Sequence, residues 1–174
     1  MRSKKSPVGQ FFNEGLDEED DDYDHVFGLM PRIGQVVIWF NALESDIDHM
    51  ICRYISDRSD QMGLMVVSNM MYATKVDLFE KITSDFLRAQ GTEIDWFPQL
   101  MSELRECGTL RNKVVHANWL YTDVHGYTQV KIRVGKQGLE HELTQFTSES
   151  MDLIIKKIET TRERLDYFHM EFLP

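Results

Sequence analysis

The residues best suited to chemistry lie in one short stretch, LRNKVVHANW, at residues 110–119. Arg111 and His116 have four residues between them, and Asn112 stands four positions before His116, the spacing that puts two side chains on one face of a helix. An imidazole takes or gives a proton near neutral pH, and a guanidinium offers charged hydrogen-bond donors to a phosphate. Together these residue types suit proton transfer at a phosphate group.

The helical position of Arg111 also fits a structural role. With about 100° between successive residues, Arg111 projects close to the centre of the apolar stripe of its predicted helix. Glu44 falls on the buried face of an earlier predicted helix, where a carboxylate needs a cationic or hydrogen-bonding partner. One alternative is therefore a buried Arg111–Glu44 ion pair that fixes the helix register, with His116 an exposed residue at the helix end.

Hydrophobic periodicity indicates the elements that must position these residues. Apolar residues at spacings of three and four predict helices over about 31–56, 74–90 and 96–118, and a last helix from about 148. Strict alternation on both sides of a GKQG turn predicts a β-hairpin over 130–143, in which Lys131 and Arg133 face glutamates of the second strand. The predicted fold is all-α: a bundle of four main helices with a β-hairpin inserted before the last one.

Composition narrows the class of protein. A chain of 174 residues with 42% hydrophobic residues is sufficient for one compact domain. No apolar run approaches the roughly 18 residues of a membrane span, and the two cysteines suit a reducing cytosol, so we expect a cytoplasmic protein without a membrane partner. The histidines and cysteines lack metal-ligand spacing, and neither a metal nor a cofactor is expected. The methionines of 62–71 are expected in the core or in a dimer interface.

The net charge of −10 is unevenly distributed. Residues 14–24 hold eight carboxylates and no basic residue, so residues 1–24 carry −5 and residues 25–174 carry the other −5. We therefore expect a disordered acidic tail over 1–24, followed by a helical domain over 25–174. The whole-chain charge argues against nucleic acid as a partner. An alternative is that the tail mimics nucleic acid and covers a basic site.

The stretch RNKVVHANW resembles the motif of the HEPN superfamily (higher eukaryotes and prokaryotes nucleotide-binding domains). That family is a helical bundle whose hallmark is an arginine, four to six intervening residues and a histidine on a late helix. The segments WFNALESDI at 39–47 and TKVDLFEKI at 74–82 also look like the family. The resemblance covers residues 27–174.

The resemblance implies a metal-independent endoribonuclease of the toxin or phage-defence kind, with RNA as substrate and an antitoxin protein as a further partner. Family members form homodimers in which two motif helices build one composite site. A ribose 2′-hydroxyl attacks the adjacent phosphate there and leaves a 2′,3′-cyclic phosphate. His116 would transfer the proton, Arg111 would stabilise the phosphate, and Asn112 would orient the imidazole or hold a phosphate oxygen.

Three neighbours would support this site. Lys113 would add positive charge, while Trp119 and Tyr121 would stack on a base or, alternatively, cap the end of the bundle. The family also contains members that have lost catalysis. The alternative function is therefore a catalytically inactive dimerisation or nucleotide-binding module.

Overall fold

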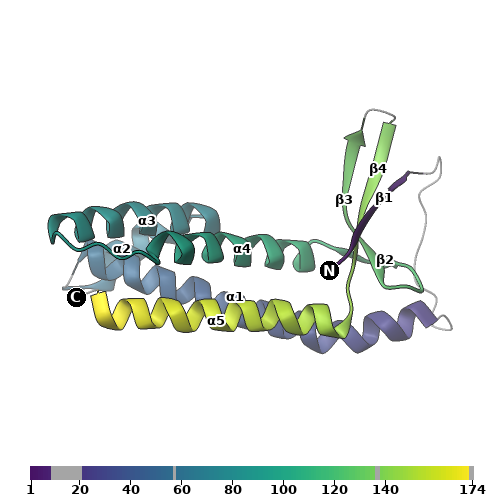
Figure 1. The fold of residues 1–174 in the computed structure, drawn as a ribbon, viewed down its shortest axis with the longest axis horizontal. Coiled ribbons are helices and arrows are strands. Elements are labelled where there is room, and N and C mark those ends of the chain that lie inside the picture. Colours follow the sequence, from purple (N-terminus) through teal and green to yellow (C-terminus); the bar gives the residue numbers. More distant parts are fainter. Residues whose placement is uncertain (9–20, 57, 136–137, 173–174) are drawn as a thin grey trace. The chain divides into compact units, whose positions relative to one another are not determined.

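The computed structural model describes residues 1–8, 21–56, 58–135 and 138–172. In chain order the elements are β1 (Ser3–Pro7), α1 (Asp21–Ile55), α2 (Asp60–Val67), α3 (Tyr72–Ala89), α4 (Phe97–Val115), β2 (Asn118–Thr122), β3 (Tyr127–Gly135), β4 (Gly138–Gln145) and α5 (Ser148–Phe172) (Figure 1). The prediction of an all-α fold is wrong. The protein is a mixed α/β protein, because four of these elements form one antiparallel sheet.

The predicted hairpin is the centre of that sheet, whose strand order is β1-β4-β3-β2. β3 and β4 are the hairpin itself, with Lys131 opposite Glu142 and Arg133 opposite Glu140. Arg133 also forms an ion pair with Glu142 across the strands, with 2.6 Å between Nε and Oε2. The predicted hairpin and its Arg133–glutamate pairing are confirmed.

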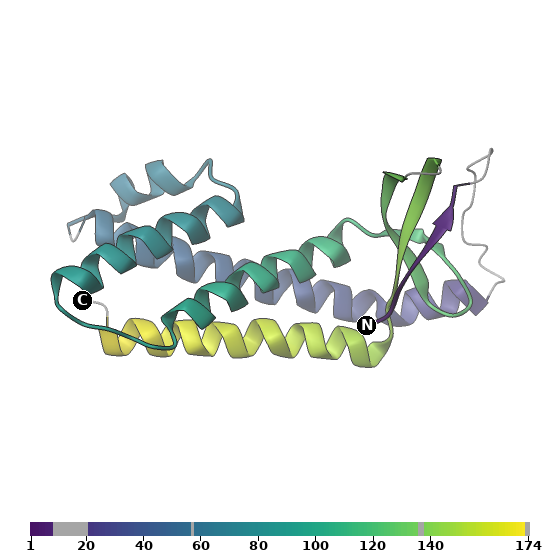
Figure 2. The same cartoon turned by 45° about the horizontal axis from the view of Figure 1, so that its top comes forward.

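β1 pairs with the free edge of β4, and its lysine Lys5 lies close to the same two glutamates, Glu140 and Glu142. Lys5 lies opposite Glu142 in the antiparallel register, and its Nζ is 3.6 Å from Glu140. Lys4 points to the other side, where its ammonium lies 2.8 Å from Asp123. Hydrogen bonds from Lys4 and two backbone amides outweigh the effect of burial and lower the pKa of Asp123. Lys4 and Lys5 of the N-terminal strand thus form ion pairs with Asp123 and Glu140, and Figure 2 shows β1 beside β4.

The structure differs from the predicted disordered tail at both of its ends. Residues 3–7 form β1, and α1 begins at Asp21, ten residues before its predicted start. Val26 and Leu29 are buried, so the apolar stripe of α1 extends upstream of Pro31, which lies inside the helix. Residues 9–20, which hold much of the acidic run, lie outside the described residues.

The chain folds into two compact units. Residues 1–37 and 110–155 form one, here called the sheet unit, and residues 38–109 and 156–174 form the other, the helical unit. The core of the sheet unit includes Val26 and Val36 of α1, Phe146 and Met151. The core of the helical unit is larger and is built from fully buried side chains of α1, α3, α4 and α5, among them Leu43, Ile47, Phe79, Leu100, Leu104, Ile158 and Phe168.

The short helix α2 was not predicted, and it places methionines at the surface. Gly63 packs α2 against α1 so closely that an added Cβ would lie 2.5 Å from the Cα of Cys52. The opposite side of this segment exposes Met62, Met65 and Met71, with exposed fractions of 59%, 71% and 77%. These three methionines therefore do not fill the core, and the dimer interface, the other predicted place for the methionines of 62–71, stays a prediction.

α1 is also long and apolar enough to cross a membrane by length and composition alone. The segment Asp24–Ile55 has a mean hydropathy of 1.3 in its most apolar window. This window has a high mean hydropathy but is not an uninterrupted apolar run, because polar residues such as Arg32, Gln35 and Asn41 interrupt the apolar residues of α1. The core helix of a water-soluble protein passes the same test, and Val36, Phe40 and Leu43 of α1 are buried in the protein itself.

Candidate functional site

The arginine–histidine motif occupies the C-terminal end of α4 in the sheet unit. α4 ends at Val115, yet the backbone N–H of His116 still donates to the carbonyl of Asn112 at 3.0 Å. This bond keeps Asn112 and His116 one helical turn apart, both with exposed side chains, while Arg111 is half-buried. An imidazole and an amide therefore share an accessible helix end.

Arg111 and Asn112 are joined by a side-chain hydrogen bond. Nη1 of Arg111 donates to Oδ1 of Asn112 at 3.1 Å. Because the amide oxygen accepts from the guanidinium, the amide nitrogen is the end of Asn112 that can donate to a ligand. The pair therefore offers N–H donors, the kind of group that binds a phosphate oxygen.

Glu44 has a different partner from the predicted one. Its Oε1 is 2.8 Å from Nζ of Lys75, and Oδ2 of Asp48 is 2.7 Å from the same nitrogen. Burial lowers the pKa of Lys75, but the hydrogen bonds and charges of Asp48 and Glu44 outweigh it and raise the pKa overall. Glu44 therefore belongs to an ion cluster within the helical unit and does not require Arg111 as its cation.

Sequence reasoning missed Lys75, although the sequence carried a signal for it. Lys75 stands four residues before Phe79 and eight before Thr83, both of which are buried on α3. A lysine on that stripe is 7% exposed in the structure. A buried lysine needs a carboxylate as much as a buried carboxylate needs a cation. Glu44 and Lys75 could have been considered as a pair on this ground.

The aromatic residues after the motif have structural partners. Nε1 of Trp119 donates to the carbonyl of Val114 at 3.0 Å, and its ring packs on Phe146 with 4.9 Å between centroids. Trp119 thus satisfies a carbonyl at the end of α4, which is the capping alternative. The ring of Tyr121 stacks on His141, with 4.9 Å between centroids and 20° between planes. Base stacking by either ring stays a prediction.

The two units differ in charge. Outside residues 14–24, the sheet unit contains nine lysines and arginines against five carboxylates, a net +4, and the half-buried Lys113 is one of these cations. The helical unit contains ten basic and sixteen acidic residues, a net −6. The acidity of the whole chain thus comes from the helical unit and from the run at 14–24. Outside that run, the unit that contains the motif has a net positive charge.

In the part of the chain that the structure describes, no three histidine, cysteine, aspartate or glutamate side chains gather as metal ligands. No protein-family model matches the sequence, and comparison with curated proteins and with solved structures finds no match.

Proposed function

We propose that this protein is a metal-independent endoribonuclease of the HEPN type, acting in the cytoplasm as a homodimer. The observation that carries the proposal is the end of α4. An exposed imidazole, His116, and an exposed amide, Asn112, share this helix end with a guanidinium that is hydrogen-bonded to the amide. The resemblance of RNKVVHANW to the family motif supplies the reaction type. A toxin or phage-defence role with an antitoxin partner belongs to the same proposal.

The reaction needs a base and an acid at one phosphate. The base removes the proton of a ribose 2′-hydroxyl as its oxygen attacks the adjacent phosphorus. The bond from phosphorus to the 5′-oxygen breaks, and the acid gives that oxygen a proton. The products are a 2′,3′-cyclic phosphate and a 5′-hydroxyl, and because the nucleophile is the 2′-hydroxyl, DNA is not a substrate.

Each chain contributes one motif imidazole. Two copies of His116 facing one phosphate would act as base and acid, which is why the proposal includes a homodimer. The two copies of Arg111 would donate charged hydrogen bonds to the phosphate oxygens as negative charge develops on them. Asn112 would hold one of these oxygens through its amide nitrogen. Lys113 would add to the local positive charge.

The basic balance of the sheet unit favours RNA over an acidic protein as the ligand of this site. Nucleic acid binding depends on lysines and arginines that neutralise phosphates. The net +4 of the sheet unit outside residues 14–24 meets this need, although the chain as a whole is acidic. Since the excess is small, we expect weak binding that falls steeply as salt is raised.

The test is cleavage of single-stranded RNA in EDTA, followed by end-group analysis of the products. The wild-type protein should release cyclic phosphate ends, and His116→Ala should lower the rate about 100-fold or more, the usual contribution of a general acid or base. His125→Ala is the matched control, because His125 is an exposed histidine of the same unit outside the motif. Its rate should equal that of the wild type.

Several results would contradict the proposal. Equal cleavage by His116→Ala and His125→Ala would show that the motif is not catalytic. RNA left intact by a well-folded dimer, across varied substrates, would support the inactive dimerisation or nucleotide-binding module instead. A strict monomer by light scattering would exclude the composite site.

A further inference from the structure

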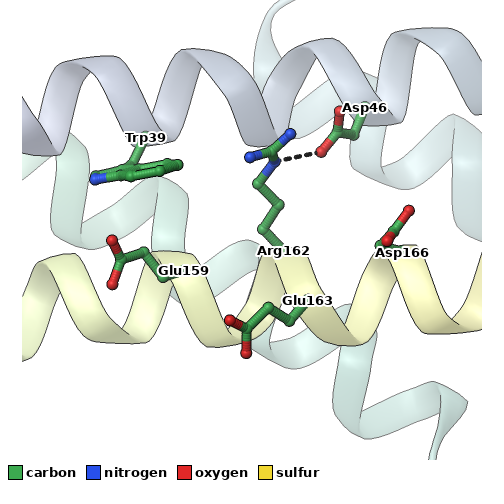
Figure 3. A pocket seen from close by; sticks show the side chains of 6 residues that line it. All are labelled: Trp39, Asp46, Glu159, Arg162, Glu163 and Asp166. Carbon is green, nitrogen blue, oxygen red and sulfur yellow. Dashed lines mark hydrogen bonds and ion pairs between the residues drawn. The ribbon is translucent and has the colours of Figure 1, made fainter.

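Two cavities flank α5 in the helical unit, and each has a tryptophan in its wall. One, of about 460 Å³, lies between α1 and α5 and is lined by Trp39, Asp46, Glu159, Arg162, Glu163 and Asp166 (Figure 3). The other, of about 290 Å³, is lined by Trp96, Thr160, Glu163, Arg164 and Tyr167. Glu163, an exposed residue of α5, belongs to both linings. We call them together the two-tryptophan surface.

Both arginines of this surface have carboxylate partners. Nε of Arg162 donates to Asp46 at 2.6 Å, across the first cavity from α5 to α1 (Figure 3). Nη1 of Arg164 donates to Glu103 on α4, also at 2.6 Å. Hydrogen bonding to Asp46 and, to a smaller extent, the charge of Asp166 raise the pKa of Arg162, so its positive charge acts on both carboxylates.

Three carboxylates of α5 form no ion pair in the part of the chain that the structure describes. Glu159, Glu163 and Asp166 stand at i, i+4 and i+7 on one face of the helix, where like charges repel. Across residues 1–8, 21–56, 58–135 and 138–172, no lysine, arginine or histidine nitrogen lies within 4.0 Å of these carboxylate oxygens. The lining of the first cavity thus holds four carboxylates against one arginine, Arg162, and a cation from outside the chain would relieve the remaining negative charge.

The tryptophans offer an additional attraction for a cation, and that of Trp96 is already used within the chain. The indole of Trp39 lies flat at one end of the first cavity, beside Glu159 (Figure 3). The ring of Trp96 packs against the rings of Tyr167 and Phe168, whose centroids lie 6.0 Å and 5.7 Å from its own. The guanidinium of Arg164 lies 5.4 Å from the centroid of Trp96, so this indole already carries a cation on its ring. Among aromatic side chains, the indole of tryptophan attracts a guanidinium group most strongly.

We propose that the two-tryptophan surface binds an arginine-rich segment of another protein. An arginine of that segment would enter the first cavity between the indole of Trp39 and the carboxylate of Glu159, which lie at the same end of it (Figure 3). The segment would then cross α5 at Glu163 toward the second cavity. Buried tryptophan, tyrosine and arginine side chains are the residues that dominate protein interfaces.

Charge complementarity selects this occupant over two others. The helical unit carries −6, which repels the phosphates of RNA. A second copy of the chain would bring the same acidic face, and like charges would then oppose each other across a symmetric interface. A basic protein segment meets neither obstacle. This site is separate from the proposed nuclease function, because all its residues belong to the helical unit.

The test is titration with a short arginine-rich peptide and with the same peptide carrying citrulline, the neutral isostere, at every arginine. Tryptophan fluorescence and calorimetry report the binding. We expect the arginine peptide to bind, with an affinity that falls as salt rises, and the citrulline peptide not to bind. The double variant Glu159→Gln/Glu163→Gln should weaken binding about tenfold, or about threefold for each exposed charge removed.

Glu171→Gln is the matched control, since Glu171 is an exposed glutamate of α5 outside both linings. Equal affinities of the double variant and this control would overturn the proposal, and so would equal binding of the citrulline peptide. Spermine binding as tightly as the peptide would assign the surface to a small polyamine. A wild-type dimer that dissociates in the double variant would assign it to a second copy. RNA cleavage by the double variant should match that of the wild type.

Discussion

Replacing Lys75 by methionine should destabilise the protein strongly, and the structure gives the size of the effect. The ammonium of Lys75 is 2.8 Å from Glu44 and 2.7 Å from Asp48, two carboxylates one turn apart on α1. Methionine keeps the length and the apolar stem of the side chain and removes only the charge. The variant would therefore leave two carboxylates facing each other without the cation between them.

The magnitude depends on how far these carboxylates are screened by water. Removing one partner of a buried ion pair costs about 3–5 kcal/mol. The side chains of Glu44 and Asp48 retain exposed fractions of 27% and 23%, so solvent relieves part of the repulsion. We expect the free energy of unfolding to fall by about 2–4 kcal/mol at neutral pH. For a chain of this length, the melting temperature should fall by about 5–15 °C.

Thermal and urea unfolding followed by circular dichroism would measure this loss. Lys81→Met is the matched control, because Lys81 is an exposed lysine of the same helix, and its change should stay within about 0.5 kcal/mol. Adding Glu44→Gln and Asp48→Asn to Lys75→Met should recover much of the lost stability, because the unpaired charges are then gone. A Lys75→Met variant as stable as the control, or a triple variant no more stable than the single one, would refute the charge-based reasoning.

The pH dependence of the free energy of unfolding independently tests whether the charge of Lys75 stabilises the fold. The pKa of Lys75 is raised in the folded state, since hydrogen bonds and charges of Asp48 and Glu44 outweigh burial. Such a group stabilises the fold fully below its unfolded pKa of about 10.4, and this contribution is lost as the pH rises through the folded pKa. The stability difference between wild type and Lys75→Met should therefore shrink in alkaline solution above about pH 10.4.

Two further changes test the packing of α2 and the role of the acidic run. Gly63→Ala should cost about 1–3 kcal/mol in urea unfolding, because its Cβ would meet the Cα of Cys52 at 2.5 Å, whereas Gly34→Ala, with no atom within 4 Å, should be neutral or stabilising. Converting the carboxylates of residues 14–20 to amides in a His116→Ala background should raise RNA affinity in fluorescence anisotropy at low salt, and unchanged affinity would show that the run does not compete with RNA.

Elements whose signal is local could be predicted from the sequence. The four long helices α1, α3, α4 and α5 appear as apolar spacings of three and four, and β3 and β4 appear as alternation around one turn. β1 has no such signal: SKKSP is a polar segment that becomes a strand because β4 offers it a partner more than 130 residues away, with Lys5 opposite Glu142. Strand formation here depends on long-range pairing, which a window along the chain does not contain.

In the candidate site, too, features set by local helix geometry could be predicted from the sequence, and features set by long-range packing could not. Helix geometry alone puts Asn112 and His116 on one face, and the structure has them one turn apart at the end of α4. The partner of Glu44 depends on which helices pack together, and two cations, Arg111 and Lys75, stood on apolar stripes of different predicted helices. The apolar pattern ranks neither above the other. Only the packing of α3 against α1 selects Lys75.

The net charge of −10 is not the charge of any single surface that a ligand contacts. Charges act over roughly 8–10 Å at physiological salt, so a bound phosphate responds to its neighbours and not to the sum over the chain. The sum divides into +4 for the sheet unit outside residues 14–24, −8 for that run and −6 for the helical unit. A polyanion and a polycation are therefore each attracted by a different unit of the same chain. If both proposals hold, salt should weaken RNA and arginine-rich peptide alike, while acidic-to-amide changes on α5 should weaken only the peptide.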